Sequence, residues 1–322
     1  MSQKGNNRAM IEDVYSVDLP VGEKLSIKRN RYTPNSGLTD GLKRITIITG
    51  IHGDELEGQY VCYLLNDFLQ KNKDAVRGVI DIYPAANPLG LDSITRGFPF
   101  YEVDLNRQFP GSKNDFLPSQ VTDGIVEAAK GSDIAVDIHS SNIFLREIPQ
   151  VRIASQFADT LVPLAKMLNI DFIWIHDAVT VLESTFAHAM NGHGCKTLVV
   201  EMGVGMRITE EYGKNLLKGL LNLMRAEGIL DIAPIEGLRE PMTSEGGDVS
   251  YINADAAGIF VPVQEHSKCI KLGEIVGYIY DPLEGKVLQE ILSPSNGILF
   301  TVREYPIVYE GSLLARIFGD GK

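Results

Sequence analysis

The sequence predicts an α/β fold: a mostly parallel mixed sheet with helices on both faces, followed by a small C-terminal all-β domain resembling a barrel. Short β-branched runs alternate with amphipathic segments between residues 45 and 230, which is typical of strands joined by helical crossovers. After about Gly237 the helical periodicity is lost, and short runs bounded by glycines replace it. At 322 residues the chain also exceeds one comfortable core. We therefore predict two domains, 1–237 and 238–322.

The predicted elements follow this alternation. An edge hairpin is expected at 11–33, with its turn near 20–22. Strands are expected at 45–49, 79–84, 134–138, 171–175 and 197–200. Helices are expected at 56–69, 119–130, 157–168, 185–190 and 208–230. The long connection through residues 96–111 is rich in aromatic residues and proline, so we expect a packed, functional loop.

The tail contains an internal near-repeat. Residues 258–263 resemble residues 297–302, and a second glycine follows the first after 15 residues in one copy and 14 in the other. Two such halves predict a flattened barrel with pseudo-twofold symmetry, similar to a lipoyl- or biotinyl-carrier domain. Carrier domains present a modifiable lysine, typically beside methionine, whereas Lys286 follows a glycine and has no neighbouring methionine. We expect an unmodified structural or oligomerisation module.

The composition narrows the class of protein. With 44% hydrophobic and 22% charged residues the chain is typical of globular proteins. The net charge of -12 argues against a nucleic-acid or anionic-membrane partner. The three cysteines lie in or beside apolar segments, so we expect buried free thiols in a reducing compartment. Without an apolar signal-peptide core or a run of membrane-spanning length, the sequence predicts a cytoplasmic protein.

Polar side chains follow three of the predicted strands. His52 and Glu55 lie on the first strand-to-helix turn, and His139 and Glu201 each follow a later strand. The carboxyl ends of parallel strands meet at one edge of a sheet, where ligands bind. Two imidazoles and one carboxylate with an open fourth position form a zinc site found in hydrolases. We predict one Zn²⁺ per chain on His52, Glu55 and His139; the alternative is a polar turn with a solvated Glu55.

Glu201 is left free by this ligand set. A carboxylate beside a metal-activated water can accept its proton and pass the proton to a leaving group. Glu201 is therefore the candidate general base and acid. The alternative is a strand-end glutamate that forms a salt bridge.

The long loop supplies positive charge. Arg107 beside Asn106 could bind a substrate carboxylate through a bidentate contact. Arg96 could polarise a carbonyl and stabilise the oxyanion. Alternatively, one or both arginines simply hold the loop through Asp104 or Glu102.

Other histidines are weaker candidates. His176 follows a predicted strand and is expected to be a packing or surface residue. His188 and His193 are expected to line a loop near the site, with His193 as a candidate substrate contact. His266 is expected at the surface of the tail.

Four motifs together resemble the succinylglutamate desuccinylase/aspartoacylase family, a branch of the zinc-carboxypeptidase-like hydrolases. They are Gly50-x-His52-Gly53-x-Glu55, Asp104-Leu105-Asn106-Arg107-x-Phe109-Pro110-Gly111, Asp137-x-His139 and Glu201-x-Gly203. The resemblance implies zinc on the two histidines and Glu55, and Glu201 as general base and acid. It also implies carboxylate binding by Asn106 and Arg107, and Arg96 assisting the carbonyl.

We therefore expect a zinc-dependent amidohydrolase that removes an acyl group from the amine of a small N-acyl amino acid. The alternatives are a metallocarboxypeptidase acting on short peptides and a non-catalytic binding member of the same fold. Asp177 or Glu183 near the rim could select a substrate with a second amine. The sequence leaves open whether the protein is a homo-oligomer.

Overall fold

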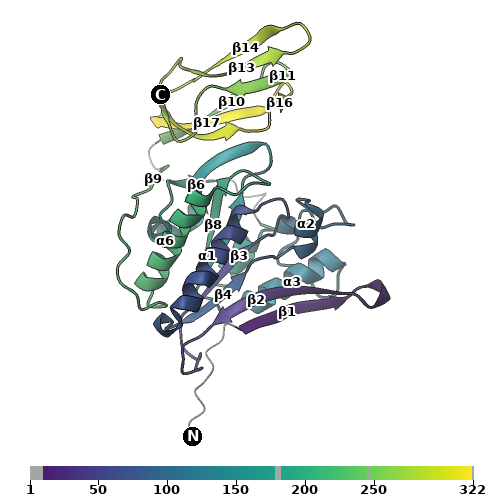
Figure 1. The fold of residues 1–322 in the computed structure, drawn as a ribbon, viewed down its shortest axis with the longest axis vertical. Coiled ribbons are helices and arrows are strands. Elements are labelled where there is room, and N and C mark those ends of the chain that lie inside the picture. Colours follow the sequence, from purple (N-terminus) through teal and green to yellow (C-terminus); the bar gives the residue numbers. More distant parts are fainter. Residues whose placement is uncertain (1–9, 178–182, 245–246, 321–322) are drawn as a thin grey trace.

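The computed structural model describes residues 10–177, 183–244 and 247–320. Within them it contains a large mixed sheet, a separate four-stranded antiparallel sheet and six α-helices (Figure 1). The predicted α/β fold is therefore confirmed. The expectation about a signal peptide rests partly on residues 1–9, which lie outside the described residues.

The strands of the N-terminal part build most of the large sheet. They are β1 (Met10–Asp18), β2 (Lys24–Tyr32), β3 (Arg44–Thr49), β4 (Val79–Tyr83), β5 (Ile134–Ser140), β6 (Leu145–Ala154), β7 (Phe172–His176), β8 (Lys196–Gly203) and β9 (Met242–Thr243). Seven of them follow the order β1-β2-β4-β3-β5-β8-β6 across the sheet, whereas β7 pairs with β6 and β9 pairs with β7 beside this path. Strands β4, β3, β5 and β8 run parallel, so the carboxyl ends of β3, β5 and β8 lie side by side.

Helices cover both faces of these strands. They are α1 (Glu57–Lys71), α2 (Pro88–Ser93), α3 (Leu117–Ala129), α4 (Ala158–Ala165), α5 (Phe186–Gly192) and α6 (Glu210–Ala226). Alternate side chains of a strand point to opposite faces. Ile47 packs with residues of α1 and α6, whereas Ile48 packs with residues of α3 and α5. The two apolar cores therefore lie on opposite sides of one sheet, as predicted.

The C-terminal part consists of β-strands. They are β10 (Gly247–Asn253), β11 (Gly258–Pro262), β12 (Cys269–Ile270), β13 (Ile275–Asp281), β14 (Lys286–Leu292), β15 (Gly297–Arg303), β16 (Ile307–Val308) and β17 (Leu313–Asp320). Strands β15, β17 and β10 continue the large sheet beyond β6, while β14, β13, β11 and β16 form the separate sheet. The near-repeat segments become β11 and β15, one in each sheet, and side chains of both contribute to a third apolar core.

Three expectations need correction or addition. Strand β6 has no counterpart among the predicted strands, and it joins the two parts of the chain by pairing with both β8 and β15. Cys269 is exposed, whereas Cys62 and Cys195 are buried thiols as expected. His266 is half-buried and contacts the hydroxyl of Tyr212, so it is not a free surface residue.

No described helix has both the length and the apolar character needed to cross a membrane.

Candidate active site

The turn after β3 places His52 and Glu55 at the carboxyl edge of the sheet. Gly50 has a φ of +71°, a conformation that residues with a Cβ rarely adopt, and this allows the chain to leave the strand sharply. A Cβ on Gly53 would lie 2.0 Å from the carbonyl carbon of Gly90, so only glycine permits this close approach. The two glycines therefore fix the turn that carries both side chains.

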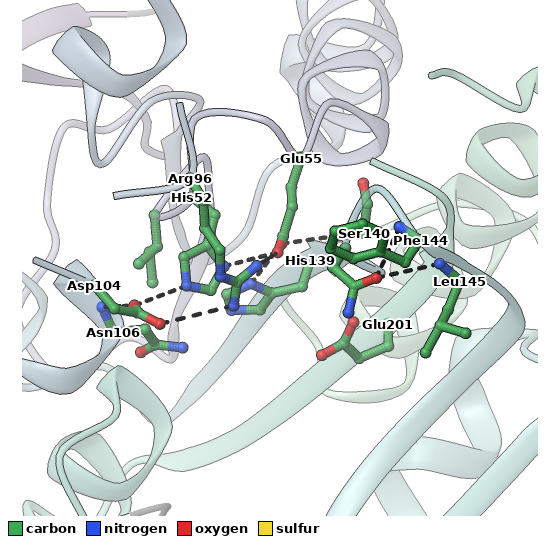
Figure 2. Close-up of polar contacts among 12 residues, drawn as sticks. His52, Glu55, Arg96, Asp104, Asn106, His139, Ser140, Phe144, Leu145 and Glu201 are labelled. Atoms are coloured by element: carbon green, nitrogen blue, oxygen red, sulfur yellow. Dashed lines mark hydrogen bonds and ion pairs between the residues drawn. The ribbon is translucent and has the colours of Figure 1, made fainter. Parts of the chain in front are cut away.

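His52, Glu55 and His139 converge in a buried cluster (Figure 2). Nδ1 of His52 lies 2.8 Å from Oε1 of Glu55, and Nδ1 of His139 lies 2.9 Å from Oε2 of the same carboxylate. One donor atom from each residue lies within 4.8 Å of the others. Although His52 Nδ1 lies this close to Glu55, the two are not aligned for a hydrogen bond, and this buried nitrogen has no hydrogen-bond partner among the described residues. The donor set and this orphaned nitrogen suit a divalent cation that prefers nitrogen and oxygen ligands, such as Zn²⁺.

Two further carboxylates lie beside the Nε2 atoms of the imidazoles. Nε2 of His52 is 2.9 Å from Oδ1 of Asp104, and Nε2 of His139 is 3.1 Å from Oδ2 of Asp137. A carboxylate next to one ring nitrogen holds the proton there and leaves the other nitrogen free to bind a metal. Both histidines are therefore arranged to offer Nδ1 toward Glu55.

The charges of the site also favour a divalent cation. Burial lowers the pKa of His139, but Asp137 and Glu55 outweigh it and raise the pKa well above its ordinary value. Burial alone would raise the pKa of Glu55, yet the two imidazoles hold it below its usual range. The carboxylates of Glu55, Asp104 and Asp137 next to the two imidazoles outnumber the single guanidinium, that of Arg96, which contacts Glu55 and Asp104. A divalent cation would offset this local excess of carboxylates.

Glu201 comes from the strand beside His139. It pairs with His139 in the register of β5 and β8, and its side chain lines the same cavity. Burial raises its pKa to about 7, although Arg152, whose Nη1 lies 3.3 Å from Oε1 of Glu201, acts in the opposite direction. Glu201 lies outside the three-residue donor cluster. A partly buried carboxylate with a pKa near neutrality can accept a proton and return it.

The loop arginines reach the same cavity. Nη1 of Arg96 donates to Oε1 of Glu55 at 2.6 Å, and its Nη2 lies 3.8 Å from Asp104. Oδ1 of Asn106 accepts from the backbone of Phe186 at 3.0 Å, and Nη1 of Arg107 donates to the Asn106 carbonyl at 2.8 Å. Arg96 thus holds the loop against Glu55, a contact that the sequence did not predict.

The cavity has a volume of about 240 Å³ and extends from the cluster toward β6 and α5. All seven residues predicted from the sequence border it or belong to the cluster. Its described lining also contains His176, which was expected to be a packing or surface residue, together with His188 and Asp177. Glu183 and His193 are not among the described residues that line it.

The sequence analysis gave no role to two residues of the site, Asp137, which it named only within a motif, and Arg152. Asp137 lies two positions before His139 on the same strand, and the alternation of strand side chains places both on one face. That spacing could have identified it as the partner of the imidazole. Arg152 is a charged residue in a largely buried strand, which is a recognisable signal only once β6 is assigned.

A family model matches more than half of the chain. The model describes the catalytic domain of succinylglutamate desuccinylases and aspartoacylases, and it matches residues 41–226. These residues include every side chain of the cluster, Glu201 and the long loop. Among curated proteins, no sequence gives a significant match.

Solved structures resemble the whole chain. A succinylglutamate desuccinylase/aspartoacylase from Rhodobacter sphaeroides is 20% identical with a TM-score of 0.79, covering 100% of this chain and 99% of that one. The product-bound ectoine utilization protein EutE (DoeB) from Ruegeria pomeroyi is 18% identical with a TM-score of 0.78, covering 97% and 96%. A succinylglutamate desuccinylase from Silicibacter sp. TM1040 is 21% identical with a TM-score of 0.79, covering 95% and 92%. At these identities the likeness concerns the fold.

Proposed function

The chain belongs to the succinylglutamate desuccinylase/aspartoacylase family, and we propose that it is a zinc-dependent hydrolase that removes an acyl group from the amine of a small N-acyl amino acid. One observation carries the proposal: the buried cluster of His52, Glu55 and His139 adjoins a cavity that Glu201 and Arg107 also line. The candidate ligand set, a carboxylate outside that set and a guanidinium thus border a single space.

His52, Glu55 and His139 would hold the zinc ion. A zinc ion in such a site supplies Lewis acidity, which makes a water molecule acidic and polarises a carbonyl group. Asp104 and Asp137, which lie beside Nε2 of the two rings, would keep the imidazoles in the tautomer that ligation requires. The site can therefore form without rearrangement of its histidines.

Glu201 would act as general base and then as general acid. Its carboxylate takes a proton from the attacking water, and the same proton then goes to the amine that leaves when the amide bond breaks. Its position beside His139, outside the donor cluster, leaves its oxygens available for this transfer. Arg96 would stabilise the negative charge that develops on the carbonyl oxygen.

Asn106 and Arg107 would anchor the substrate carboxylate. The side chains of both residues bond to backbone groups, which fixes the loop, and both residues line the cavity. A guanidinium and an amide on adjacent residues suit the planar, bidentate geometry of a carboxylate. The net negative charge of the chain makes such a local cation necessary for binding an anionic substrate.

The test is a hydrolysis screen with added Zn²⁺. N-acetyl, N-succinyl and N-formyl amino acids are incubated with the protein, and the released amine is measured against unacylated controls and peptides with a free C-terminus. We expect amine release from at least one N-acyl amino acid, with the peptides left intact. Hydrolysis of the peptides alone would indicate a carboxypeptidase, and zinc binding without hydrolysis of either class would indicate a binding protein.

Replacement of Arg107 should weaken substrate binding. A charge-assisted contact contributes about 1.5–3 kcal/mol, so Arg107→Ala should raise KM by roughly 10- to 100-fold, with a smaller effect on kcat. Arg107→Lys is the matched control, because it keeps the charge but loses the bidentate geometry, and its KM should fall between the two. An unchanged KM in Arg107→Ala would refute the anchoring role.

A further inference from the structure

Glu147 is a buried carboxylate at the junction between the N-terminal part and the C-terminal strands. It lies on β6 with 1% of its surface exposed. Oε2 accepts a hydrogen bond from Nη2 of Arg152 at 2.5 Å and another from the side chain of Gln150. Oε1 accepts from Nη1 of Arg316 at 2.9 Å. A carboxylate at this depth needs such partners, because an unpaired buried charge is strongly destabilising.

Arg152 connects Glu147 to the active site. Its guanidinium lies between the two carboxylates, with Nη2 on Glu147 and Nη1 3.3 Å from Glu201. Burial lowers the pKa of Arg152, but Glu147 and Glu201 outweigh it, so the guanidinium stays charged. Arg152 is therefore a cation shared between a structural carboxylate and the candidate base.

Arg316 comes from the far side of the junction. It lies on β17. Strand β15 lies between β17 and β6, and Thr301 of β15 pairs with Glu147 of β6. Two guanidinium groups lie over the ring of Trp174. The guanidinium carbon is 5.4 Å from the ring centroid in Arg152 and 5.5 Å from it in Arg316. The aromatic ring and Glu147 together hold the two arginines apart in a fixed arrangement.

We propose that Arg316 is a positioning residue that acts on Glu201 through Glu147 and Arg152, which gives the C-terminal strands a part in catalysis. The inference rests on the proposed role of Glu201 as general base. Charges alternate along the row from Arg316 through Glu147 and Arg152 to Glu201. Without Arg316, Glu147 draws the Arg152 guanidinium to itself, and Glu201 loses the cation that orients its carboxylate.

The primary variant is Arg316→Met, which removes the charge but keeps an unbranched side chain beside Trp174. We expect kcat to fall about 10-fold, the low end for residues that act through another group, with KM and zinc content unchanged. Arg316→Lys should recover most of the lost kcat, because it restores the charge without the guanidinium fork. If Arg316 only stabilised the fold, its replacement would also change KM or zinc content.

A double variant makes the test specific. If Glu147 competes for Arg152 when Arg316 is absent, then Glu147→Gln added to Arg316→Met should raise kcat above that of the single variant. Glu304→Gln is the matched control, because it breaks the ion pair of Arg146 and Glu304 at the same junction. That control should leave kcat unchanged.

Three outcomes would overturn the inference. The first is that Arg316→Met keeps the kcat of the wild type. The second is that the double variant has a lower kcat than Arg316→Met, because the losses of the two substitutions add, and the third is that Glu304→Gln loses as much kcat as Arg316→Met. These outcomes are distinct from failure of the proposed function. A wild-type protein that hydrolyses no N-acyl amino acid refutes the proposed function and the inference with it, whereas an active wild type with an unaffected Arg316→Met refutes the inference alone.

Discussion

Glu201→Gln is expected to keep the zinc ion and to lose most of the turnover. The substitution keeps the shape of the side chain but removes the basic oxygen, so the proton of the attacking water has no acceptor. General base and acid catalysis contributes roughly 10²- to 10⁴-fold, and kcat should fall by that factor. Because the donor cluster does not include Glu201, zinc content per chain should equal that of the wild type.

The measurement combines steady-state kinetics with elemental analysis of the same protein preparation. Glu304→Gln serves as a control for the change itself, because it makes the same substitution at an ion-paired glutamate outside the cavity. Full activity in Glu201→Gln would end the general-base assignment. Loss of zinc together with activity would instead make Glu201 a ligand.

Most of the N-terminal part could be predicted because its signals are local. The β-branched run before Gly50 and the amphipathic segment after Leu56 specify β3 and α1 without help from distant residues. Polar residues at the ends of such strands must meet at one edge when the strands are parallel. The cluster of His52, Glu55 and His139 follows from this geometry, since β3 and β5 are neighbours.

Strand β6 could not be predicted because its signal depends on tertiary contacts. Glu147, Gln150 and Arg152 interrupt its apolar pattern, and these side chains are tolerated only because partners neutralise or bond them. One of those partners, Arg316, lies 169 residues further along the chain. No local pattern contains that pairing, so the row of charges behind Glu201 became visible only in the structure.

The contact between Arg96 and Glu55 has a similar explanation. The sequence offered Asp104 and Glu102 as partners because both are close along the loop. In the structure the nearest carboxylate oxygen is Oε1 of Glu55, at 2.6 Å, whereas Asp104 is 3.8 Å away. The fold brings the loop against the turn after β3. A hydrogen bond from the backbone N–H of Gly53 to the carbonyl oxygen of Arg96 fixes this approach.

His139→Ala is expected to abolish both zinc binding and hydrolysis. The substitution removes one of three protein ligands and leaves Glu55 with only His52 from the cluster, so zinc should no longer copurify with the chain. Turnover should fall to that of the wild type after removal of zinc by a chelator. Elemental analysis and the kinetics of both samples measure the two effects, and a thermal unfolding midpoint checks that the variant folds.

Asp137→Asn supplies the graded comparison for this loss. It keeps the His139 ligand but replaces the carboxylate beside the ring with a neutral amide. Zinc affinity should therefore drop by about 10- to 100-fold, and activity should return at high zinc concentration. His139→Ala should not recover under the same conditions. Recovery of both variants to the same extent would show that His139 is dispensable for binding the ion, and the cluster would then need a different ligand set.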